Sequence, residues 1–149
     1  MKRQYCAFLI DDHLFGVEVA NVQEVVRHQS MTRVPLARAE IGGLINLRGQ
    51  LVTAIDTRQL LGLPPLPDGK LSMNVVLRTS EGGAVSLLVD DIDNVVEVDG
   101  RAFEVPPETV RGRARELISG VYKLEDRLLL ILCTDTVLDL EKRNVTAVR

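Results

Sequence analysis

The chain has 149 residues, of which 46% are apolar and 26% are charged, and its net charge at neutral pH is −3. This length and apolar content allow a sizeable core without disulfides or metal. The charge balance argues against a nucleic-acid-binding protein, and the longest apolar run, residues 128–133, is too short to cross a bilayer. We expect a soluble cytoplasmic protein with no nucleic-acid partner and no direct membrane insertion.

Short runs rich in β-branched and aromatic residues alternate with turn residues along the whole chain, a pattern typical of all-β proteins. One of the turns, Gly82-Gly83, suits a tight hairpin. The expected strands are, in chain order, residues 4–10, 14–19, 44–47, 50–56, 74–79, 84–90, 118–123 and 127–133.

Three places favour a short helical turn. An asparagine cap with Glu24 three residues on resembles a capping box and predicts one turn at residues 22–25. Residues 58–61 predict a brief helix after the strand that ends at position 56. Asp135 is expected to cap a last turn that runs through Leu140.

The segment 63–69, Leu-Pro-Pro-Leu-Pro-Asp-Gly, holds three of the six prolines. It reads mainly as a stiff connector between two halves of the chain, with a Pro-x-x-Pro ligand for an SH3 or WW domain as the lesser alternative.

The chain carries its own sequence twice, and such self-similarity indicates two copies of one structural unit. Apolar positions of residues 15–26 fall on those of 85–96 at a shift of 70. Residues 41–52 fall on 118–129 at a shift of 77, with Gly43 over Gly120.

The copies differ most at one turn. Asn-Leu-Arg-Gly at 46–49 is aligned with Lys-Leu-Glu-Asp at 123–126, so Arg48 faces Glu125. We interpret this as a cationic turn exchanged for an anionic one. Arg48 either holds its turn by pairing with a nearby carboxylate, from Glu18, Glu24 or Asp56, or presents its planar guanidinium to a partner.

Catalytic patterns are poorly matched. Asp56-Thr57 and Asp135-Thr136 resemble the paired motifs of aspartic proteases, but Arg58 and Val137 stand where the third residue must be glycine. We therefore expect no enzyme, and interpret Asp56 as a turn or cap residue.

Ligand-binding patterns are equally weak. The acidic run 90–94 is followed by Val95 where an EF-hand calcium loop needs glycine, so we interpret it as a solvated turn after a strand. Cys6 and Cys133 read as buried thiols, and His13 and His28 as isolated surface residues. The sequence therefore predicts no metal and no cofactor.

A set of short motifs resembles the CheW coupling proteins of bacterial chemotaxis. The resemblance runs from about residue 4 to 140, and its most specific part is the Asn-Leu-Arg-Gly at 46–49, preceded by Gly43 and followed by an apolar strand that ends in Asp56. The other matching segments are residues 15–17, 22–25, 32–35, 41–43, 88–90, 118–120 and 128–132.

This resemblance implies an all-β fold of two small five-stranded SH3-like β-barrels packed on each other, with short helical turns. The whole chain, 1–149, would be a single CheW-like domain. Its first barrel is expected mainly at 14–66 and its second mainly at 70–134, with terminal segments completing the sheets.

The resemblance also implies a function. Family members are non-enzymatic adaptors that bridge the cytoplasmic tips of methyl-accepting chemoreceptors and the regulatory domain of a CheA-type histidine kinase, and are recruited to membrane-associated receptor arrays. The alternative is a CheW-like scaffold or competitor module in a receptor-kinase pathway outside chemotaxis.

Two sets of site residues follow from the resemblance. The receptor-binding set is Val22, Glu24, Asn46, Leu47, Arg48 and Gly49. The kinase-binding set is Leu88, Val89, Asp90, Ile92 and Val95.

Overall fold

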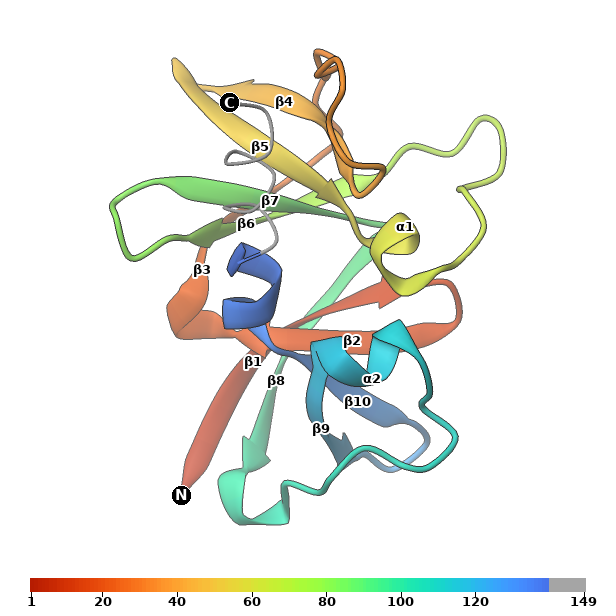
Figure 1. The fold of residues 1–149 in the computed structure, drawn as a ribbon. Coiled ribbons are helices and arrows are strands. Elements are labelled where there is room, and N and C mark those ends of the chain that lie inside the picture. The colour runs from red at the N-terminus through yellow and green to blue at the C-terminus, as the bar shows by residue number, and fades with distance from the viewer. Residues whose placement is uncertain (140–149) are drawn as a thin grey trace.

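The computed structural model describes residues 1–139, and its strands form two five-stranded sheets (Figure 1). The strands are β1 (Lys2–Ile10), β2 (His13–Glu18), β3 (Val22–Val26), β4 (Ile41–Leu47), β5 (Gln50–Asp56), β6 (Met73–Arg78), β7 (Ala84–Val89), β8 (Asp91–Asp99), β9 (Ile118–Lys123) and β10 (Leu128–Leu132). The short helical elements are η1 (Val19–Asn21), α1 (Thr57–Leu61), η2 (Gly100–Ala102) and α2 (Arg113–Leu117), and residues 134–139 are also helical.

Both sheets have the same strand order, as a duplication predicts. Sheet A runs β8-β1-β2-β10-β9, and sheet B runs β3-β6-β7-β5-β4. Strands whose numbers differ by five, such as β1 and β6, therefore occupy the same position in the two sheets. Each sheet also contains one parallel pair at the corresponding position, β10 with β2 and β5 with β7.

Each sheet takes strands from both copies of the repeat, which differs from the expected ranges of 14–66 and 70–134. β1 and β2 join β8, β9 and β10, whereas β6 and β7 join β3, β4 and β5. The exchange arises because the chain changes sheet after β2 and again after β7. As a result, neither sheet can be assembled from one half of the chain.

The expected barrels are not closed. In the described residues, the edge strands of each sheet form no ladder with each other. The chain beyond each edge strand instead makes one isolated bridge to the opposite edge, from Thr32 to Leu44 in sheet B and from Glu104 to Val121 in sheet A. Each sheet is thus a strongly curled open barrel.

Glycines allow these bridging segments to pass closely over the opposite edge strand. A Cβ on Gly120 would lie 2.1 Å from the ring of Phe103, and one on Gly43 would lie 2.8 Å from the carbonyl oxygen of Thr32. The Gly43/Gly120 match in the repeat therefore has a common structural cause.

Successive side chains of a strand point to opposite faces of the sheet, and the buried side chains therefore fall into three clusters. On β1, Cys6, Phe8 and Ile10 enter a core shared by both sheets, while Tyr5 and Ala7 enter the interior of sheet A. A third cluster fills the interior of sheet B. The shared core is the largest and packs the two sheets into one body.

Several local predictions are confirmed. The hairpin of β6 and β7 turns at Gly82, whose φ is +82°. Asp56 caps α1, because its carboxylate accepts a hydrogen bond from the amide of Gln59 at 3.2 Å. Cys6 is a buried thiol as expected, and burial raises its pKa, whereas Cys133 is only half-buried.

Other local predictions are wrong. Residues 22–26 form strand β3, paired with β6, and the helical turn lies just before it in η1. The acidic run expected as a turn is mostly strand β8, which pairs with β1. Hydrogen bonds to an existing sheet edge override local propensity in both cases.

Two further differences concern connections. The proline-rich segment 63–69 joins α1 to β6 within the region of sheet B and does not link the two sheets. The last helical segment begins at residue 134, so Asp135 lies inside it and is not its cap. Leu140 lies outside the described residues.

Candidate functional site

The motif at 46–49 forms the hairpin turn between β4 and β5. Arg48 and Gly49 both have positive φ, +51° and +87°, as the two central residues of a type I′ turn require. The side chain of Asn46 accepts a hydrogen bond from the Gly49 amide at 2.8 Å. The turn therefore projects Arg48 away from the sheet in a fixed direction.

Arg48 pairs with Glu24 across the open side of sheet B. Nη2 of Arg48 donates to Oε1 of Glu24, which lies on the opposite edge strand, β3. The Arg48 side chain is 77% exposed and that of Glu24 is 17% exposed. The guanidinium thus pairs with Glu24, one of the three carboxylates expected for a structural role, and its side chain still faces solvent.

The strands that carry this pair also bear exposed apolar side chains. Val25 follows Glu24 on β3 and is 37% exposed, and Leu51, which is opposite Asn46 in the β4–β5 pairing, is 68% exposed. An exposed apolar surface with a charged rim is typical of a protein contact. We call Glu24, Val25, Arg48 and Leu51 the sheet B surface.

Two members of the expected receptor set do not belong to this surface. Leu47 is 8% exposed and lies in the interior of sheet B. Val22 packs against the core shared by the sheets. The structure therefore brings together Glu24, Asn46, Arg48 and Gly49 and separates Val22 and Leu47 from them.

Sheet A carries a matching arrangement. Nη2 of Arg127, at the end of the β9–β10 turn, lies 2.8 Å from Oδ2 of Asp93 on the edge strand β8. Val95 and Leu128, the repeat equivalents of Val25 and Leu51, are 59% and 38% exposed. We call these four residues the sheet A surface.

This arrangement corrects our interpretation of the two turns. Glu125 does replace Arg48 in the aligned sequence, but Arg127, two residues later, supplies the cation that reaches the edge strand. The ion pair is thus kept with the same polarity in both sheets. What differs is the added negative charge at Glu125 and Asp126.

The expected kinase set is mostly unavailable to a partner. β7 lies inside sheet B with both faces covered, so Leu88 and Val89 are 8% and 1% exposed. Ile92 packs against the shared core. Of this set, Val95 alone is well exposed.

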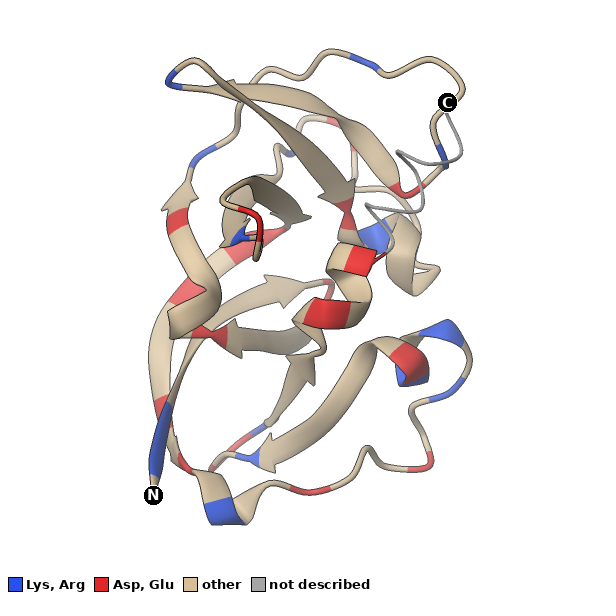
Figure 2. Cartoon of the chain, turned by 60° about the vertical axis from the view of Figure 1, so that its left-hand side comes forward, with Lys and Arg blue, Asp and Glu red and all other residues tan. Residues whose placement is uncertain are grey.

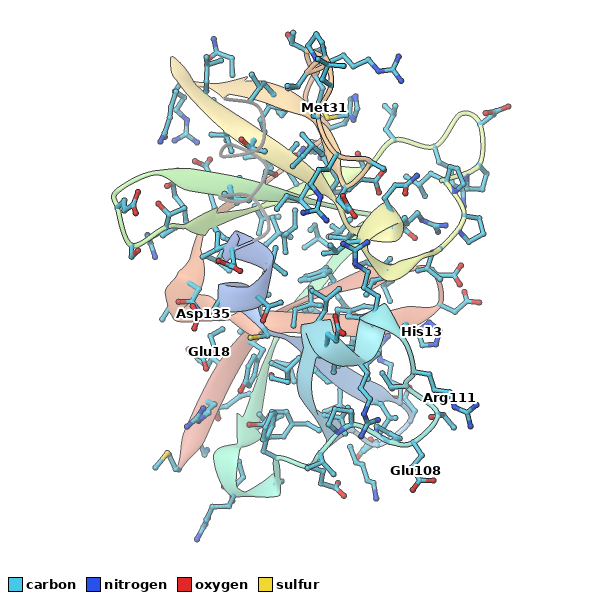
Figure 3. The ribbon with its side chains drawn as sticks, viewed as in Figure 1. His13, Glu18, Met31, Glu108, Arg111 and Asp135 are labelled. Carbon is cyan, nitrogen blue, oxygen red and sulfur yellow. The ribbon has the colours of Figure 1, made fainter. Side chains whose placement is uncertain are left out.

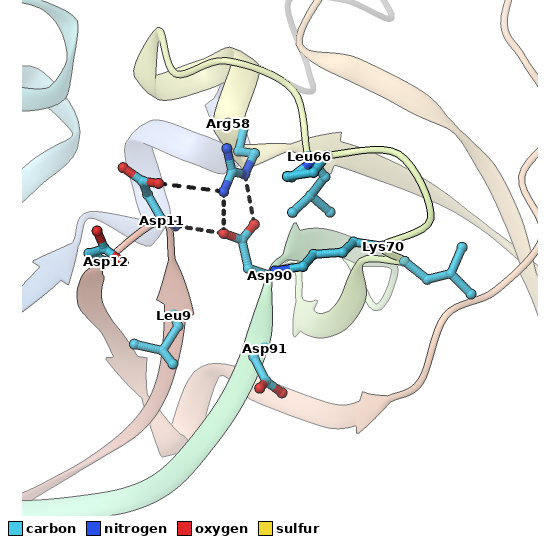
Figure 4. Close-up of a pocket in the computed structure, with 10 residues that line it drawn as sticks. Leu9, Asp11, Asp12, Arg58, Leu66, Lys70, Asp90 and Asp91 are labelled. Carbon is cyan, nitrogen blue, oxygen red and sulfur yellow. Dashed lines mark hydrogen bonds and ion pairs between the residues drawn. The ribbon is translucent and has the colours of Figure 1, made fainter.

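The remaining member, Asp90, forms an ion pair with Arg58 that the sequence analysis missed (Figure 4). Burial opposes ionisation of the Asp90 carboxyl, but hydrogen bonds from Arg58 and from the Asp11 amide outweigh it and hold the pKa of Asp90 below its usual value. The only signal in the sequence was the charge of Arg58, which we had used to exclude a protease motif.

A second missed ion pair joins elements that precede β9 and β4. Nη1 of Arg113 lies 2.7 Å from Oε1 of Glu40, and Nε of Arg38 lies 3.5 Å from Oε2. Burial again opposes ionisation, but these contacts and a backbone hydrogen bond lower the pKa of Glu40.

Figure 2 shows basic and acidic residues interspersed over both sheets, unlike the single basic face of a nucleic-acid-binding protein. Among residues 1–139, the structure gathers no group of three or more His, Cys, Asp or Glu side chains able to hold a metal ion. The same residues contain no helix with the length and apolar character needed to cross a membrane.

The sequence matches a family model described as the CheW-like domain over residues 4–142. The chain belongs to the CheW-like domain family. A chemotaxis protein CheW from Bacillus subtilis (strain 168) is 32% identical over 136 residues, which cover 90% of this chain and 85% of that protein. A chemotaxis protein CheW from Rhizobium meliloti (strain 1021) is 27% identical over 141 residues, covering 95% and 90%.

The fold agrees with this assignment. The crystal structure of the scaffolding protein TtCheW from Thermoanaerobacter tengcongensis matches with a TM-score of 0.78 at 27% identity, over 89% of this chain and 85% of that chain. The two curled sheets are therefore the CheW-like fold, and the resemblance seen in the sequence motifs is confirmed.

Proposed function

We propose that this protein is a non-enzymatic adaptor of bacterial chemotaxis that couples chemoreceptors to a CheA-type histidine kinase. The observation that carries the proposal is the repetition of one surface on two sheets. A bridging protein needs two separate contact surfaces, and each sheet has an ion pair and two exposed apolar residues on its edge strand and hairpin.

The sheet B surface is the proposed receptor site. Arg48 presents unused donors of its guanidinium to solvent, and a planar fork of this kind binds carboxylates or carbonyls of a helical receptor tip. Val25 and Leu51 add apolar contact beside it. Asn46 and Gly49 act by shaping the turn that carries Arg48.

The sheet A surface is the proposed kinase site. This surface includes Val95, a member of the expected kinase set. In place of Leu88 and Val89, which are buried, we propose Leu128 and the charged residues Asp93, Glu125 and Arg127 as kinase contacts. β8 is an edge strand of sheet A, and an edge strand can pair with a strand of another β-rich domain.

Paired charge reversals test this division. Arg48→Glu should abolish activation of the kinase by receptor while direct binding to the kinase regulatory domain is retained. Arg127→Glu makes the corresponding change on sheet A and should weaken kinase binding while receptor binding is retained. Identical losses from both variants would overturn the assignment of one partner to each sheet.

A further inference from the structure

The chain passes between the two sheets at two places, and these differ in length. After β2 it crosses through the three residues of η1. After β7 it crosses through one residue, because β7 ends at Val89 and β8 begins at Asp91. The conformation of Asp90 therefore bears directly on the angle between the sheets.

The guanidinium of Arg58 donates hydrogen bonds to both carboxylate oxygens of Asp90, the residue at this crossing. Its Nε donates to Oδ1 of Asp90 at 2.9 Å, and its Nη2 donates to Oδ2 at 2.6 Å (Figure 4). Both side chains are mostly buried, 12% and 16% exposed. A two-point guanidinium–carboxylate contact restricts orientation as well as distance.

The same pair is anchored to both sheets. Arg58 belongs to α1, which continues from β5 of sheet B, and its Nη1 donates to the carbonyl of Pro64 at 2.7 Å. On the side of sheet A, the amide of Asp11 donates to Oδ2 of Asp90 at 2.6 Å, and the amide of Asp90 donates to the carbonyl of Leu9 at 3.0 Å. Asp11 lies in the turn between β1 and β2.

The other crossing has no counterpart to this pair. In the repeat, Ala20 is equivalent to Asp90 and Asp135 is equivalent to Arg58, and an alanine side chain cannot bind a carboxylate. That crossing carries longer hydrogen bonds, from Arg78 to the carbonyl of Ala20 at 3.1 Å and from Asn21 to Thr134 at 3.4 Å.

Open space lies at both crossings. A cavity of about 470 Å³ adjoins Arg58 and Asp90. A cavity of about 510 Å³ at the η1 crossing is lined by Glu18 of β2, Arg78 of β6 and Asp135 of the last helical segment, and Figure 3 shows Glu18 and Asp135 on the same side of the molecule. The two crossings thus differ in polar contacts as well as in length.

We propose that Arg58 is a positioning residue that sets the angle between sheets A and B through its two-point contact with Asp90. The proposal concerns the free protein and does not depend on the partners proposed above. If those partners bind as proposed, this angle also fixes how the sheet A and sheet B surfaces are oriented relative to each other.

Residual dipolar couplings of backbone amides test the proposal, because they report the orientation of each sheet separately. In the unaltered protein, the strands of both sheets should fit one common alignment tensor. In Arg58→Ala, each sheet should still fit its own strands well, but the two sheets should require different tensors. Arg78→Ala, which removes the guanidinium that bonds to the carbonyl of Ala20 at the other crossing, is the matched control and should keep one tensor.

A single common tensor for Arg58→Ala, or an equal loss of common alignment in Arg78→Ala, would overturn the proposal. If Arg58→Ala does not fold, Arg58→Lys should be measured in its place. Lysine keeps the positive charge but lacks the planar guanidinium that bonds to both carboxylate oxygens. In Arg58→Lys, the two sheets should also require different alignment tensors. Failure of both variants to fold would contradict a positioning role, because it would make Arg58 a requirement for folding.

Discussion

Arg48 and Glu24 lie on opposite edges of sheet B and pair with each other across its open side. Arg127 and Asp93 do the same in sheet A at 2.8 Å. Across the open side of each sheet, an isolated backbone bridge and these ion pairs connect the two edges, in place of a continuous ladder. The same ion pairs belong to the proposed contact surfaces.

Charge reversal at position 48 should change function more than stability. Arg48→Glu places a carboxylate beside Glu24, and we expect a cost of about 1 kcal/mol in unfolding free energy because the Arg48 side chain is 77% exposed and solvent screens its charge. Thermal melts and an in vitro kinase-coupling assay measure the two effects. An unfolded variant would show that the role of Arg48 is structural, and a stable variant with full coupling would remove it from the receptor site.

The two halves of the chain should not fold separately. A chain ending at Asp68 keeps β3, β4 and β5 but loses β6 and β7, which lie between β3 and β5 in sheet B. We expect a poorly dispersed amide spectrum for this fragment and a single cooperative unfolding transition for the full chain. A well-dispersed spectrum from the fragment would contradict the exchange of strands between sheets.

Gly120 should be intolerant of a side chain. A Cβ at this position would overlap the ring of Phe103, so Gly120→Ala should destabilise the protein by about 1–3 kcal/mol. Denaturant titration of Gly120→Ala, Phe103→Ala and the double variant completes a mutant cycle. The cost of Gly120→Ala should be much smaller once the ring is absent, and an unchanged cost would rule out this contact as its cause.

The contribution of Asp90 should depend on pH in a defined direction. Its pKa is lowered in the folded protein, since the hydrogen bonds from Arg58 and Asp11 outweigh the effect of burial. A lowered pKa stabilises the fold above the unfolded-state value of about 3.9, and this stabilisation is lost as pH falls through the folded-state value. The difference in unfolding free energy between the protein and Asp90→Asn should therefore be largest near neutral pH.

Urea titrations at neutral pH and at a series of values below about pH 4 check this expectation. The difference should begin to shrink once Asp90 is protonated in the unfolded state, and should level off only below its lowered folded-state pKa, where the carboxyl is protonated in both states. A difference that stays constant over this range would mean that the charge of Asp90 does not contribute to stability.

The sequence predicted the repeat, most strands and the cap at Asp56, because these depend on local alternation and turn chemistry. It could not predict that the chain changes sheet after β2 and β7. The sequence pattern of a strand is the same whether the strand pairs within its own half of the chain or with the other half. For that reason the expected barrel ranges differ from the observed sheets.

The site was predictable only in part, for a similar reason. The turn at 46–49 is specified by residues adjacent in sequence, so its shape followed from the motif. Leu88 and Val89 read as surface candidates because one chain segment does not reveal that a central strand is covered on both faces. Arg127 was missed because strict alignment paired Arg48 with Glu125, two positions earlier.

A coupling adaptor of this kind must bind a kinase and a receptor at the same time through its separate sheets. Sedimentation velocity of the protein with a CheA-type regulatory domain and a receptor-tip fragment measures this directly. We expect micromolar binding of the kinase domain, about −8 kcal/mol, and a faster-sedimenting complex that contains all three components. Displacement of the kinase domain by the receptor fragment, or failure of either to bind at high micromolar concentration, would contradict simultaneous binding through separate sheets.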